Sequence, residues 1–325
     1  MQSLSFLIIS FVIYCLTLSH DIKAGYIFVS NENSDTVTVL NLKTKEIIKN
    51  IDTGGRPRDL KFSSNGKLLY IVESEENQIS ILDISTLKIV DFIKTGDDPE
   101  IFDIHPKENL LAVSNEDDNQ LTLINLEDKT IIKTIDNVGV EPEGVNFSPD
   151  GKLIYVTSEG TNSIIIIDIK KREIVNEILV GNRPRRGLFV NDGQEYWVSN
   201  ELSSSVSIIN TAKQKIIKEI QFKIKGIKNQ NITPVDFAYS VKHNSVFVTL
   251  GNANHVAVVD ATIHTVKKYV LVGSRVWGAA LTSDNKELIV TNGNSDDISI
   301  IDLKRMLTIL SIPVGKTPHT VKISN

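Results

Sequence analysis

The chain has 325 residues, of which 41% are hydrophobic and 23% charged, and its formal net charge is −5. This is the composition of a folded globular protein, and it excludes a low-complexity or collagen-like chain. The sequence contains no basic stripe of Lys and Arg, so we do not expect a nucleic acid as partner.

The first 24 residues differ from the rest of the chain. Leu4 to Leu18 form an almost unbroken apolar run, which is shorter than the roughly 20 residues of a membrane-spanning helix. We interpret residues 1–24 as a signal peptide cleaved after Ala24, with an uncleaved anchor as the alternative, and expect a periplasmic or secreted protein. Cys15 is the only cysteine. The mature chain would therefore have neither a disulfide nor a thiolate metal site.

Two phrases recur about every 42 residues along the remaining chain. One is an apolar run that ends in Asp or Asn, and its polar residues are Asn41, Asp83, Asn125, Asp168, Asn210, Asp260 and Asp302. The other is Gly-x-x-Pro, and its last positions are Pro57, Pro99, Pro142, Pro184, Pro234, Val276 and Pro318. Both show an excess of eight residues in the same repeat. This agreement indicates seven copies of one structural unit.

Each period also contains a segment rich in β-branched and aromatic residues. These segments are YIFVSN (26–31), YIVES (70–74), LAVSN (111–115), YVTSE (155–159), YWVSN (196–200), VFVTL (246–250) and LIVTN (288–292). Four strands fit each period, and no segment has helical periodicity. A period of this length with four strands is typical of a propeller blade. We predict an all-β, seven-bladed β-propeller of four-stranded blades over residues 25–325.

These repeats resemble those of the YVTN-repeat β-propellers. They lack the Gly-His and Trp-Asp pairs of WD40 blades and the paired glycines of kelch blades. The segments Ser64-Asn65-Gly66 and Pro149-Asp150-Gly151 are expected to be hairpin turns between the first and second strands of a blade. A calcium-binding loop is the alternative for these acidic turns.

The two ends of the propeller are expected to meet in one blade. The mature chain begins with a second strand, and residues 317–325 form a first strand without a successor. Blade 1 would thus consist of residues 25–53 and 317–325. Blades 2 to 7 would begin near Arg58, Glu100, Glu143, Arg185, Val235 and Trp277. Closing the ring in this way removes the open strand edges that would otherwise aggregate. We also expect a monomer.

The residue after each Pro position is expected at the rim of the central channel. Around the ring these residues are His319, Arg58, Glu100, Glu143, Arg185, Val235 and Trp277, and Asp59 and Arg186 follow one residue later. The ring is charged in blades 2 to 5 and apolar or aromatic in blades 6 and 7. We predict that a ligand or protein partner binds at Arg58, Glu100, Glu143, Arg185, Arg186, Trp277 and His319. Alternatively, Arg58 with Glu100, and Glu143 with Arg185, are surface ion pairs worth ~0–1 kcal/mol each.

Two other features are expected on the same face. The loops after the second strands place Glu73, Asn115, Glu159, Asn200 and Asn292 there, although such residues also simply close strands. The eight extra residues lie in the link over residues 218–233, which contains Lys218, Lys223, Lys225 and Lys228. This basic flap could cover the channel mouth or dock an acidic partner. Alternatively, it is added loop length without a function.

The sequence favours binding over catalysis. It has no zinc-ligand spacing, and His319 and His255 alone would approach the rim. It has no G-x-S-x-G motif, and nothing separates the pKa values of Glu100 and Glu143 for acid–base chemistry. We predict no catalytic residue and no metal site, and the sequence requires no cofactor.

The chain is also similar to the PQQ-dependent-catabolism-associated β-propellers in length, leader and repeat number, and in the phrases PEG (142–144) and PRR (184–186). This resemblance implies a non-enzymatic periplasmic protein that works beside a quinoprotein dehydrogenase or ABC transporter components.

An alternative is a protein that handles a haem-like or quinone cofactor, or an oxidoreductase. That alternative follows a likeness to the haem-binding propeller of nitrite reductases, and His319, Arg58 and Arg185 would then hold the macrocycle. A cell-surface structural protein is a third possibility.

Overall fold

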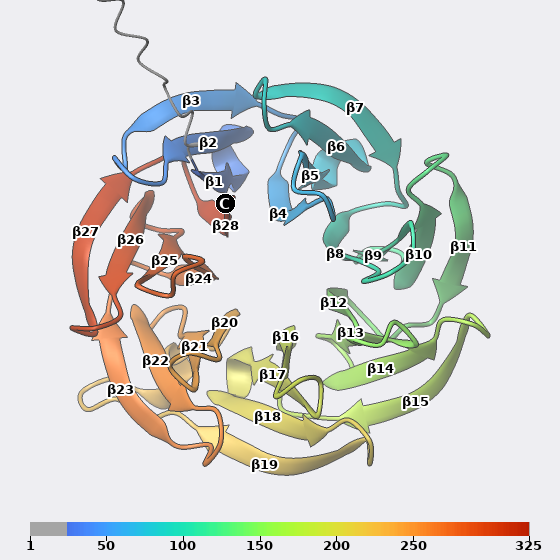
Figure 1. Ribbon diagram of the computed structural model, residues 1–325. Coiled ribbons are helices and arrows are strands. Elements are labelled where there is room, and N and C mark those ends of the chain that lie inside the picture. Colours follow the sequence, from blue (N-terminus) through green and yellow to red (C-terminus); the bar gives the residue numbers. More distant parts are fainter. Residues whose placement is uncertain (1–24, 325) are drawn as a thin grey trace, which may run out of the picture.

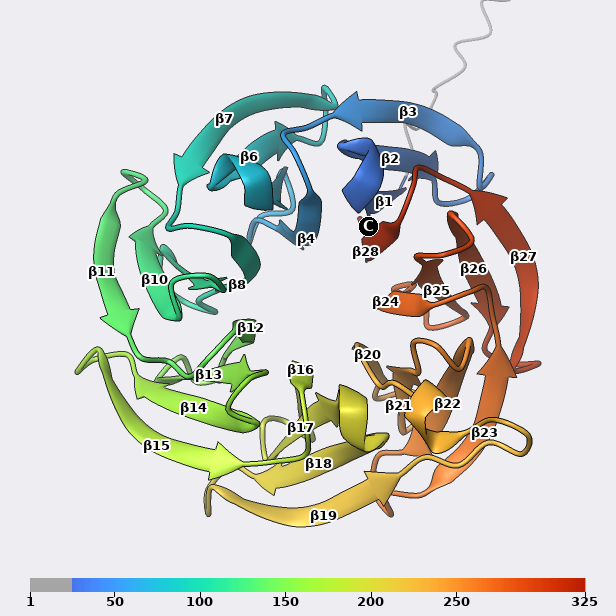
Figure 2. The ribbon, with the colours of Figure 1, turned by 180° about the vertical axis from the view of Figure 1, so that it is seen from behind.

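Seven antiparallel sheets of four strands stand around a central channel, as the two opposite views show (Figure 1, Figure 2). This computed structural model describes residues 25–324, so the predicted leader lies outside the described residues. The seven-bladed β-propeller predicted from the repeats is confirmed. No helix within residues 25–324 is long and apolar enough to span a membrane.

The first strand of each blade lines the channel and the fourth forms the perimeter (Figure 1). In this order, blades 1 to 3 are β28 (Pro318–Ile323), β1 (Tyr26–Asn31), β2 (Thr36–Asn41) and β3 (Ile47–Asp52); β4 (Pro57–Phe62), β5 (Leu68–Glu73), β6 (Gln78–Asp83) and β7 (Lys88–Lys94); β8 (Pro99–Ile104), β9 (Leu110–Asn115), β10 (Gln120–Asn125) and β11 (Ile131–Asp136).

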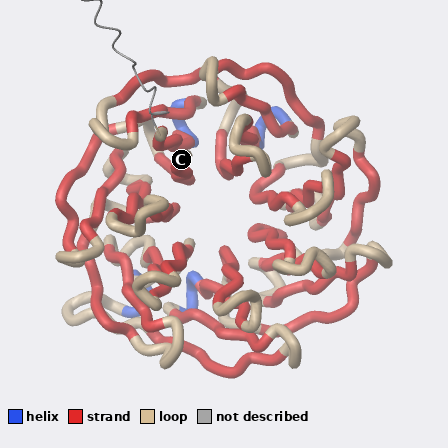
Figure 3. Tube along the Cα trace, in the orientation of Figure 1, coloured by secondary structure: helices blue, strands red, loops and turns tan. Residues whose placement is uncertain are grey.

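Blades 4 and 5 are β12 (Pro142–Phe147), β13 (Leu153–Ser158), β14 (Ser163–Asp168) and β15 (Glu173–Leu179); β16 (Pro184–Val190), β17 (Glu195–Asn200), β18 (Ser205–Asn210) and β19 (Lys215–Gln221). Blades 6 and 7 are β20 (Phe237–Ser240), β21 (Ser245–Thr249), β22 (His255–Asp260) and β23 (Val266–Leu271); β24 (Val276–Leu281), β25 (Glu287–Asn292), β26 (Asp297–Asp302) and β27 (Leu307–Pro313). The described residues also form short 3-10 helices in loops (Figure 3), which are η1 (Glu32–Ser34), η2 (Ser74–Glu76), η3 (Glu201–Ser203) and η4 (Asn229–Asn231).

The C-terminal strand completes the N-terminal blade, as the sequence predicts. β28 pairs antiparallel with β1, and Val321 lies opposite Val29. The backbone N–H of Tyr26 also donates to Ser324 Oγ at 2.8 Å. The predicted turns 64–66 and 149–151 likewise join first to second strands, because they lie between β4 and β5 and between β12 and β13.

The hydrophobic core lies between neighbouring blades. There are seven buried clusters among the described residues, and each joins one blade to the next. Between blades 7 and 1, for example, Ile289 and Ile298 pack against Ile27 and Val29. Burying one such side chain contributes about 1.5–3 kcal/mol. Packing between blades therefore stabilises the ring without any disulfide.

A Ser or Thr near the end of the second strand, present in every blade except blade 2, explains why the YVTN phrase recurs. The Thr157 hydroxyl accepts from the Gly144 N–H of its own blade at 2.8 Å and donates to the Arg185 carbonyl of the next blade at 2.7 Å. Equivalent hydroxyls donate to the following blade from Ser30, Ser114, Ser199, Thr249 and Thr291. Blade 2 has Val72 at this position, and Ser74 donates to the Pro99 carbonyl instead, at 2.7 Å. These hydroxyls fix each first strand against the blade before it.

The Asn that ends the second strand has a structural role. The Asn200 amide nitrogen donates to Ser205 Oγ at 3.0 Å and to Ser207 Oγ at 2.9 Å. A Cβ added to Gly181 would lie 2.6 Å from Asn200 Cγ, so the Gly-x-x-Pro link and the YVTN strand must fit each other. Asn115 and Asn292 contact Gly96 and Gly273 in the same way. Like Asn200, both are buried within their blades.

Candidate functional site

The first strands line the channel (Figure 1). The residues after the seven Pro positions precede or begin these strands, so they gather at one mouth of the channel. We call them the mouth ring: His319, Arg58, Glu100, Glu143, Arg185, Val235 and Trp277. In the first strands of blades 1 to 5 and 7, a shift of register directly follows the Pro position. Such a bulge re-aims the side chain at its site. The irregular start of each of these first strands thus sets the direction of the side chain that follows the Pro position.

The charged members of the mouth ring are buried, which the sequence analysis did not predict. Their exposed fractions are 0% for Glu100, 1% for Glu143, 2% for His319, 5% for Arg58 and 6% for Arg185. Charged residues are almost never so buried unless they are paired. Both expected ion pairs, Arg58 with Glu100 and Arg185 with Glu143, form. The interpretation of them as surface pairs is wrong, because these residues are buried.

Two further sets of residues cover the mouth ring, and the sequence analysis missed most of them. One set precedes the Pro positions and has left-handed backbone, at Arg56, Asp98, Glu141, Arg183 and Arg275. The other set follows the second strands, at Glu32, Glu116, Glu159 and Glu201. Both sets occupy fixed positions in the repeat, so the repeat register was the signal that could have found them. Glu159 alone had been placed on this face.

Blades 1 to 3 contribute one half of the charge network. Arg58 Nε lies 2.6 Å from Glu100 Oε2, and Arg56 Nη2 lies 3.2 Å from Glu100 Oε1. Glu32 Oε1 joins both arginines, at 3.2 Å from Arg56 Nε and 3.5 Å from Arg58 Nη1. Arg56 also reaches Asp98 at 3.0 Å. Each carboxylate is therefore held by guanidinium groups from a neighbouring blade.

Blades 4 and 5 contribute the other half. Arg185 Nη2 lies 3.3 Å from Glu143 Oε1, and Arg185 Nη1 pairs with Glu159. Arg183 Nε lies 2.6 Å from Glu159 Oε2 and 3.4 Å from Glu201 Oε2. Arg185 thus stands among three carboxylates, since Glu201 Oε2 is 3.8 Å from its Nε.

Burial and charge separate the pKa values of these carboxyl groups. Burial raises the pKa of Glu100 well above its usual value, although Arg58 opposes this. Burial likewise raises the pKa of Glu159 to about 7, against the effect of Arg185 and with that of Glu143. For Glu143, the burial effect is outweighed by Arg185, Arg186 and Arg58, which lower its pKa. Near neutral pH, the network therefore contains both protonated and ionised carboxyl groups.

The aromatic side of the mouth ring carries polar atoms without partners. The Trp277 and His319 ring centroids are 4.7 Å apart, and the guanidinium groups of Arg185 and Arg275 lie 5.5 and 5.0 Å from the Trp277 ring. Trp277 Nε1 and His319 Nε2 are buried, and neither has a hydrogen-bond partner among residues 25–324. Gly251 and Gly293 stand in blades 6 and 7 at the position where blades 1, 3, 4 and 5 carry a covering Glu. Trp277 is therefore less covered than the charged members.

His319 is neutral at neutral pH. Burial, followed by the positive charges of Arg58, Arg186 and Arg185, lowers the pKa of His319 well below its usual value. Its Nδ1 lies 3.1 Å from Thr320 Oγ1. Either ring nitrogen of a neutral imidazole can carry the proton, so Nε2 can donate to or accept from a bound group.

Arg186 lies deeper than the mouth ring, and its Nε is 3.6 Å from Glu143 Oε1. It lines a cavity of about 150 Å³ in the channel, together with residues of six first strands or their links. Carboxylate oxygens of Asp98, Glu100 and Glu116, and of Glu116, Glu141 and Glu159, lie within 4.8 Å of one another. Burial raises the pKa values of Glu100 and Glu116, which reduces the repulsion between these crowded carboxyl groups.

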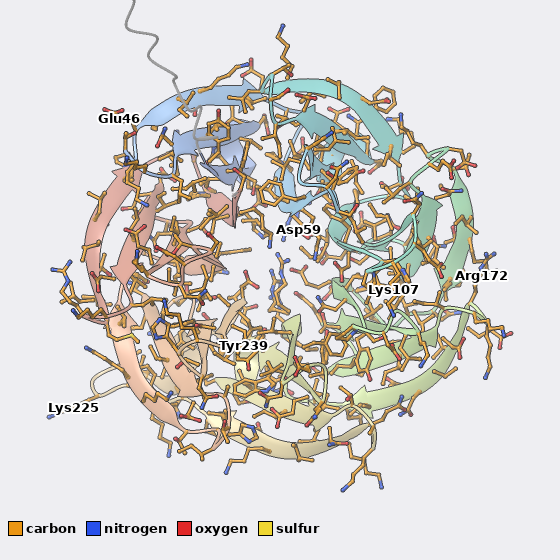
Figure 4. All side chains as sticks on the ribbon, viewed as in Figure 1. Glu46, Asp59, Lys107, Arg172, Lys225 and Tyr239 are labelled. Carbon is orange, nitrogen blue, oxygen red and sulfur yellow. The ribbon has the colours of Figure 1, made fainter. Side chains whose placement is uncertain are left out.

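The insertion between blades 5 and 6 lies at the perimeter and not over the channel mouth, as the label of Lys225 in Figure 4 shows. Phe222 and Ile232 are buried in the cluster between blades 5 and 6, and Ile224 and Ile227 pack against it. The suggestion that this segment covers the channel is wrong, because these apolar side chains tie it to the outer part of the ring.

A family model described as "YNCE-like beta-propeller" matches residues 14–196, which is more than half of the chain. The chain belongs to the YNCE-like β-propellers. A second model, the choice-of-anchor I domain, matches residues 127–296 of this YNCE-like propeller. No curated protein matches.

Solved structures share the fold of this YNCE-like propeller at low identity. Hydrazine synthase of Kuenenia stuttgartiensis is 20% identical with a TM-score of 0.76, over 85% of this chain and 91% of that chain. The periplasmic gluconolactonase PpgL of Pseudomonas aeruginosa is 16% identical with a TM-score of 0.79, over 93% and 99%. The dihydro-heme d1 dehydrogenase NirN, in complex with DHE, is 14% identical with a TM-score of 0.68, over 91% and 74%. At such identities the likeness extends to the fold alone.

Proposed function

We propose that this protein is a non-enzymatic binding propeller that holds a protein partner or a small ligand at the mouth ring. The observation that carries the proposal is the pair of buried polar atoms without partners, Trp277 Nε1 and His319 Nε2. Leaving such an atom unsatisfied costs about 1–3 kcal/mol. A bound hydrogen-bonding group would recover that free energy, and Trp and Arg are the residue types that dominate binding energies.

The charge network prepares this site for binding. Glu143 and Glu159 hold Arg185 beside the Trp277 ring. A side chain that is already fixed loses little conformational entropy when a partner binds. The partner's group that fits best is therefore a hydrogen-bond acceptor, such as a carboxylate or carbonyl, attached to a flat or apolar body that packs on Trp277.

We further propose that the protein works in the periplasm as an accessory to PQQ-dependent alcohol catabolism, beside a quinoprotein dehydrogenase or ABC transporter components. The likeness of the repeats to that group supports this role. The phrases PEG (142–144) and PRR (184–186) also supply Glu143 and Arg185, which pair with each other. The apolar run of Leu4 to Leu18 supports export.

Cofactor handling is the second candidate. Neutral His319 with a free Nε2, flanked by Arg58 and Arg185, has the chemistry of an axial ligand. However, only 2% of His319 is exposed. A macrocycle would have to reach this enclosed nitrogen, whereas a single hydrogen-bonding group of a partner or small ligand is less bulky, so partner or small-ligand binding is the better account.

Native mass spectrometry and an absorption spectrum of the protein purified from its own cells test this proposal. We expect a colourless protein that carries a small bound mass or a co-purifying protein. Visible absorbance together with a bound mass would overturn the proposal in favour of cofactor handling, and would make His319 the first residue to replace.

A further inference from the structure

The channel next to the mouth ring is lined by alternate residues of the first strands and their links. Nearest the ring are Thr320, Asp59, Ile101, Gly144, Arg186 and Asp236, and the next layer contains Lys322, Lys61, Asn146 and Leu188. Figure 4 shows Asp59 at the edge of the central opening. The cavity of about 150 Å³ equals the volume of roughly five water molecules in the liquid. It therefore suits a molecule of a few heavy atoms.

Lys322 is a cation without a partner in this cavity. Its neighbour Lys61 donates to Asp103 Oδ1 at 2.8 Å, but Lys322 forms no ion pair or hydrogen bond through its ammonium group with any residue of the described chain. Ala238 and Ala280 occupy the equivalent strand positions in blades 6 and 7, so no acid stands on that side in its own layer. Lys322 is half-buried, and partial burial of a charged group is costly unless it is paired.

Arg186 supplies a second positive group with spare donors. Its Nε is buried without a hydrogen-bond acceptor among the described residues, and its side chain is 11% exposed. Glu143, at 3.6 Å, is too far for a good hydrogen bond, and it is already engaged by Arg185 at 3.3 Å. Arg186 and Lys322 both line the cavity, so one anionic group there can meet two cations.

Two carboxylates line the same cavity and keep it close to neutral. Asp59 Oδ2 accepts from the Phe102 N–H at 3.5 Å, and Asp236 Oδ2 accepts from the Ala279 N–H at 3.2 Å. In each case the other carboxylate oxygen has no hydrogen-bond donor within residues 25–324. A simple anion would be repelled by these oxygens, whereas a ligand that also carries a donor group would bind to them.

The electrostatics of Lys322 agree with this geometry. Burial lowers the pKa of Lys322, Lys61 and Arg186 lower it further, and Asp59 and Asp236 act in the opposite direction. An anion close to Lys322 would favour its charged form. Binding at this position would therefore relieve an unfavourable feature of the free protein.

We propose that the channel cavity binds a small carboxylate that also carries a hydroxyl or amino group. Its carboxylate lies between Lys322 and Arg186, and its hydroxyl or amino group donates to Asp59 or Asp236. This inference does not depend on the mouth ring, because Trp277 and His319 do not line the cavity.

Isothermal titration calorimetry with glycolate, glycine and acetate tests the proposal. We expect the wild type to bind glycolate or glycine, and acetate to bind about tenfold more weakly because it lacks the donor group. Lys322→Met should lower the affinity for glycolate or glycine by about tenfold or more, since it removes a hydrogen bond to a charged group. Lys171→Met, at an exposed lysine, removes the same charge elsewhere and should bind as the wild type does.

Three results would overturn the proposal: no heat with either glycolate or glycine, equal affinity for acetate, or unchanged affinity in Lys322→Met. Trp277→Ala separates this site from the mouth ring, because it should keep the affinity for glycolate or glycine while it loses the partner. If Trp277→Ala instead lost only the carboxylate, the separation of the two sites would be wrong.

Discussion

Replacing Arg185 by Met should strongly destabilise the folded protein. The Arg185 guanidinium contacts Glu143, Glu159 and Glu201, and it is 6% exposed. Met keeps much of the side-chain volume and removes the charge, so two almost fully buried carboxylates lose their main partner. Removing one member of a buried ion pair costs about 3–5 kcal/mol.

The expected loss is large enough to measure by urea and thermal denaturation. At about 2.1 cal/mol/K per residue, one kcal/mol shifts the melting temperature of a domain of this size by roughly 1.6 °C, so Arg185→Met should lower it by about 5–8 °C. The loss should also be smaller at pH 5 than at pH 8. The pKa of Glu159 is already raised to about 7 by burial, so at pH 5 this carboxyl is neutral and no longer leaves a buried charge unpaired.

Arg305→Met is the matched control. Arg305 Nε lies 3.2 Å from Asp302 Oδ2, but the Arg305 side chain is 57% exposed. Such a surface pair is worth ~0–1 kcal/mol. If Arg185→Met lost no more stability than Arg305→Met, or if its loss did not depend on pH, the description of the mouth ring as a buried charge network would be refuted.

Three other predictions concern the fold and its charges. Glu159→Gln should flatten the pH dependence of stability: because the native pKa of about 7 lies above the ordinary Glu pKa of 4.5, the wild-type free energy of unfolding should fall as the pH rises between these values, as measured by urea denaturation. Thr157→Val leaves the Gly144 N–H and the Arg185 carbonyl without their partner, which should cost about 1–3 kcal/mol. Ending the chain after Lys316 removes β28, opens the ring, and should abolish cooperative unfolding followed by circular dichroism.

Each of these changes has a control. Glu177→Gln and Thr44→Val alter exposed residues and should change stability by less than about 0.5 kcal/mol. A chain that ends after Ile323 keeps the whole of β28 and should unfold cooperatively. Parallel pH profiles for Glu159→Gln and the wild type would contradict the assigned pKa. A stable Thr157→Val variant would contradict the importance of the hydroxyl between blades, and cooperative unfolding without β28 would contradict the closure of the ring.

The fold could be predicted from the sequence because the two recurring phrases are required by contacts within and between blades. The Gly of the Gly-x-x-Pro link packs against the residue that ends the second strand of its blade, as Gly181 does against Asn200. The Ser or Thr before that residue holds the first strand of the next blade. These contacts recur in most blades (blade 2 has Val72 in place of the Ser or Thr, and blade 6 has Asn231 in place of the Gly), so their spacing still indicates the number of blades and the way in which the ring closes.

The burial of the site could not be predicted in the same way. Repeat register located Arg58 and Arg185 at the channel mouth, but whether they are exposed depends on the side chains above them. Repeat register gives the positions of the covering side chains, such as Glu159 and Arg183, but it does not show that Arg183, which is not a glycine, has a left-handed backbone with φ of 53°. The insertion was misplaced for a similar reason. Its lysines were taken as the main feature of the segment, but Phe222 and Ile232 are buried between blades 5 and 6, and Ile224 and Ile227 pack against the same cluster, so the segment lies at the perimeter.

The affinity of Trp277→Ala for the co-purifying partner or ligand tests the central claim most directly. Phe92→Ala, at an aromatic residue that is 52% exposed on the perimeter strand β7, is the matched control. The account predicts that Trp277→Ala weakens binding by about thirtyfold, the effect of losing roughly 2 kcal/mol at an aromatic anchor, while Phe92→Ala binds as the wild type does. Equal affinities for all three proteins would show that the mouth ring is not the binding site.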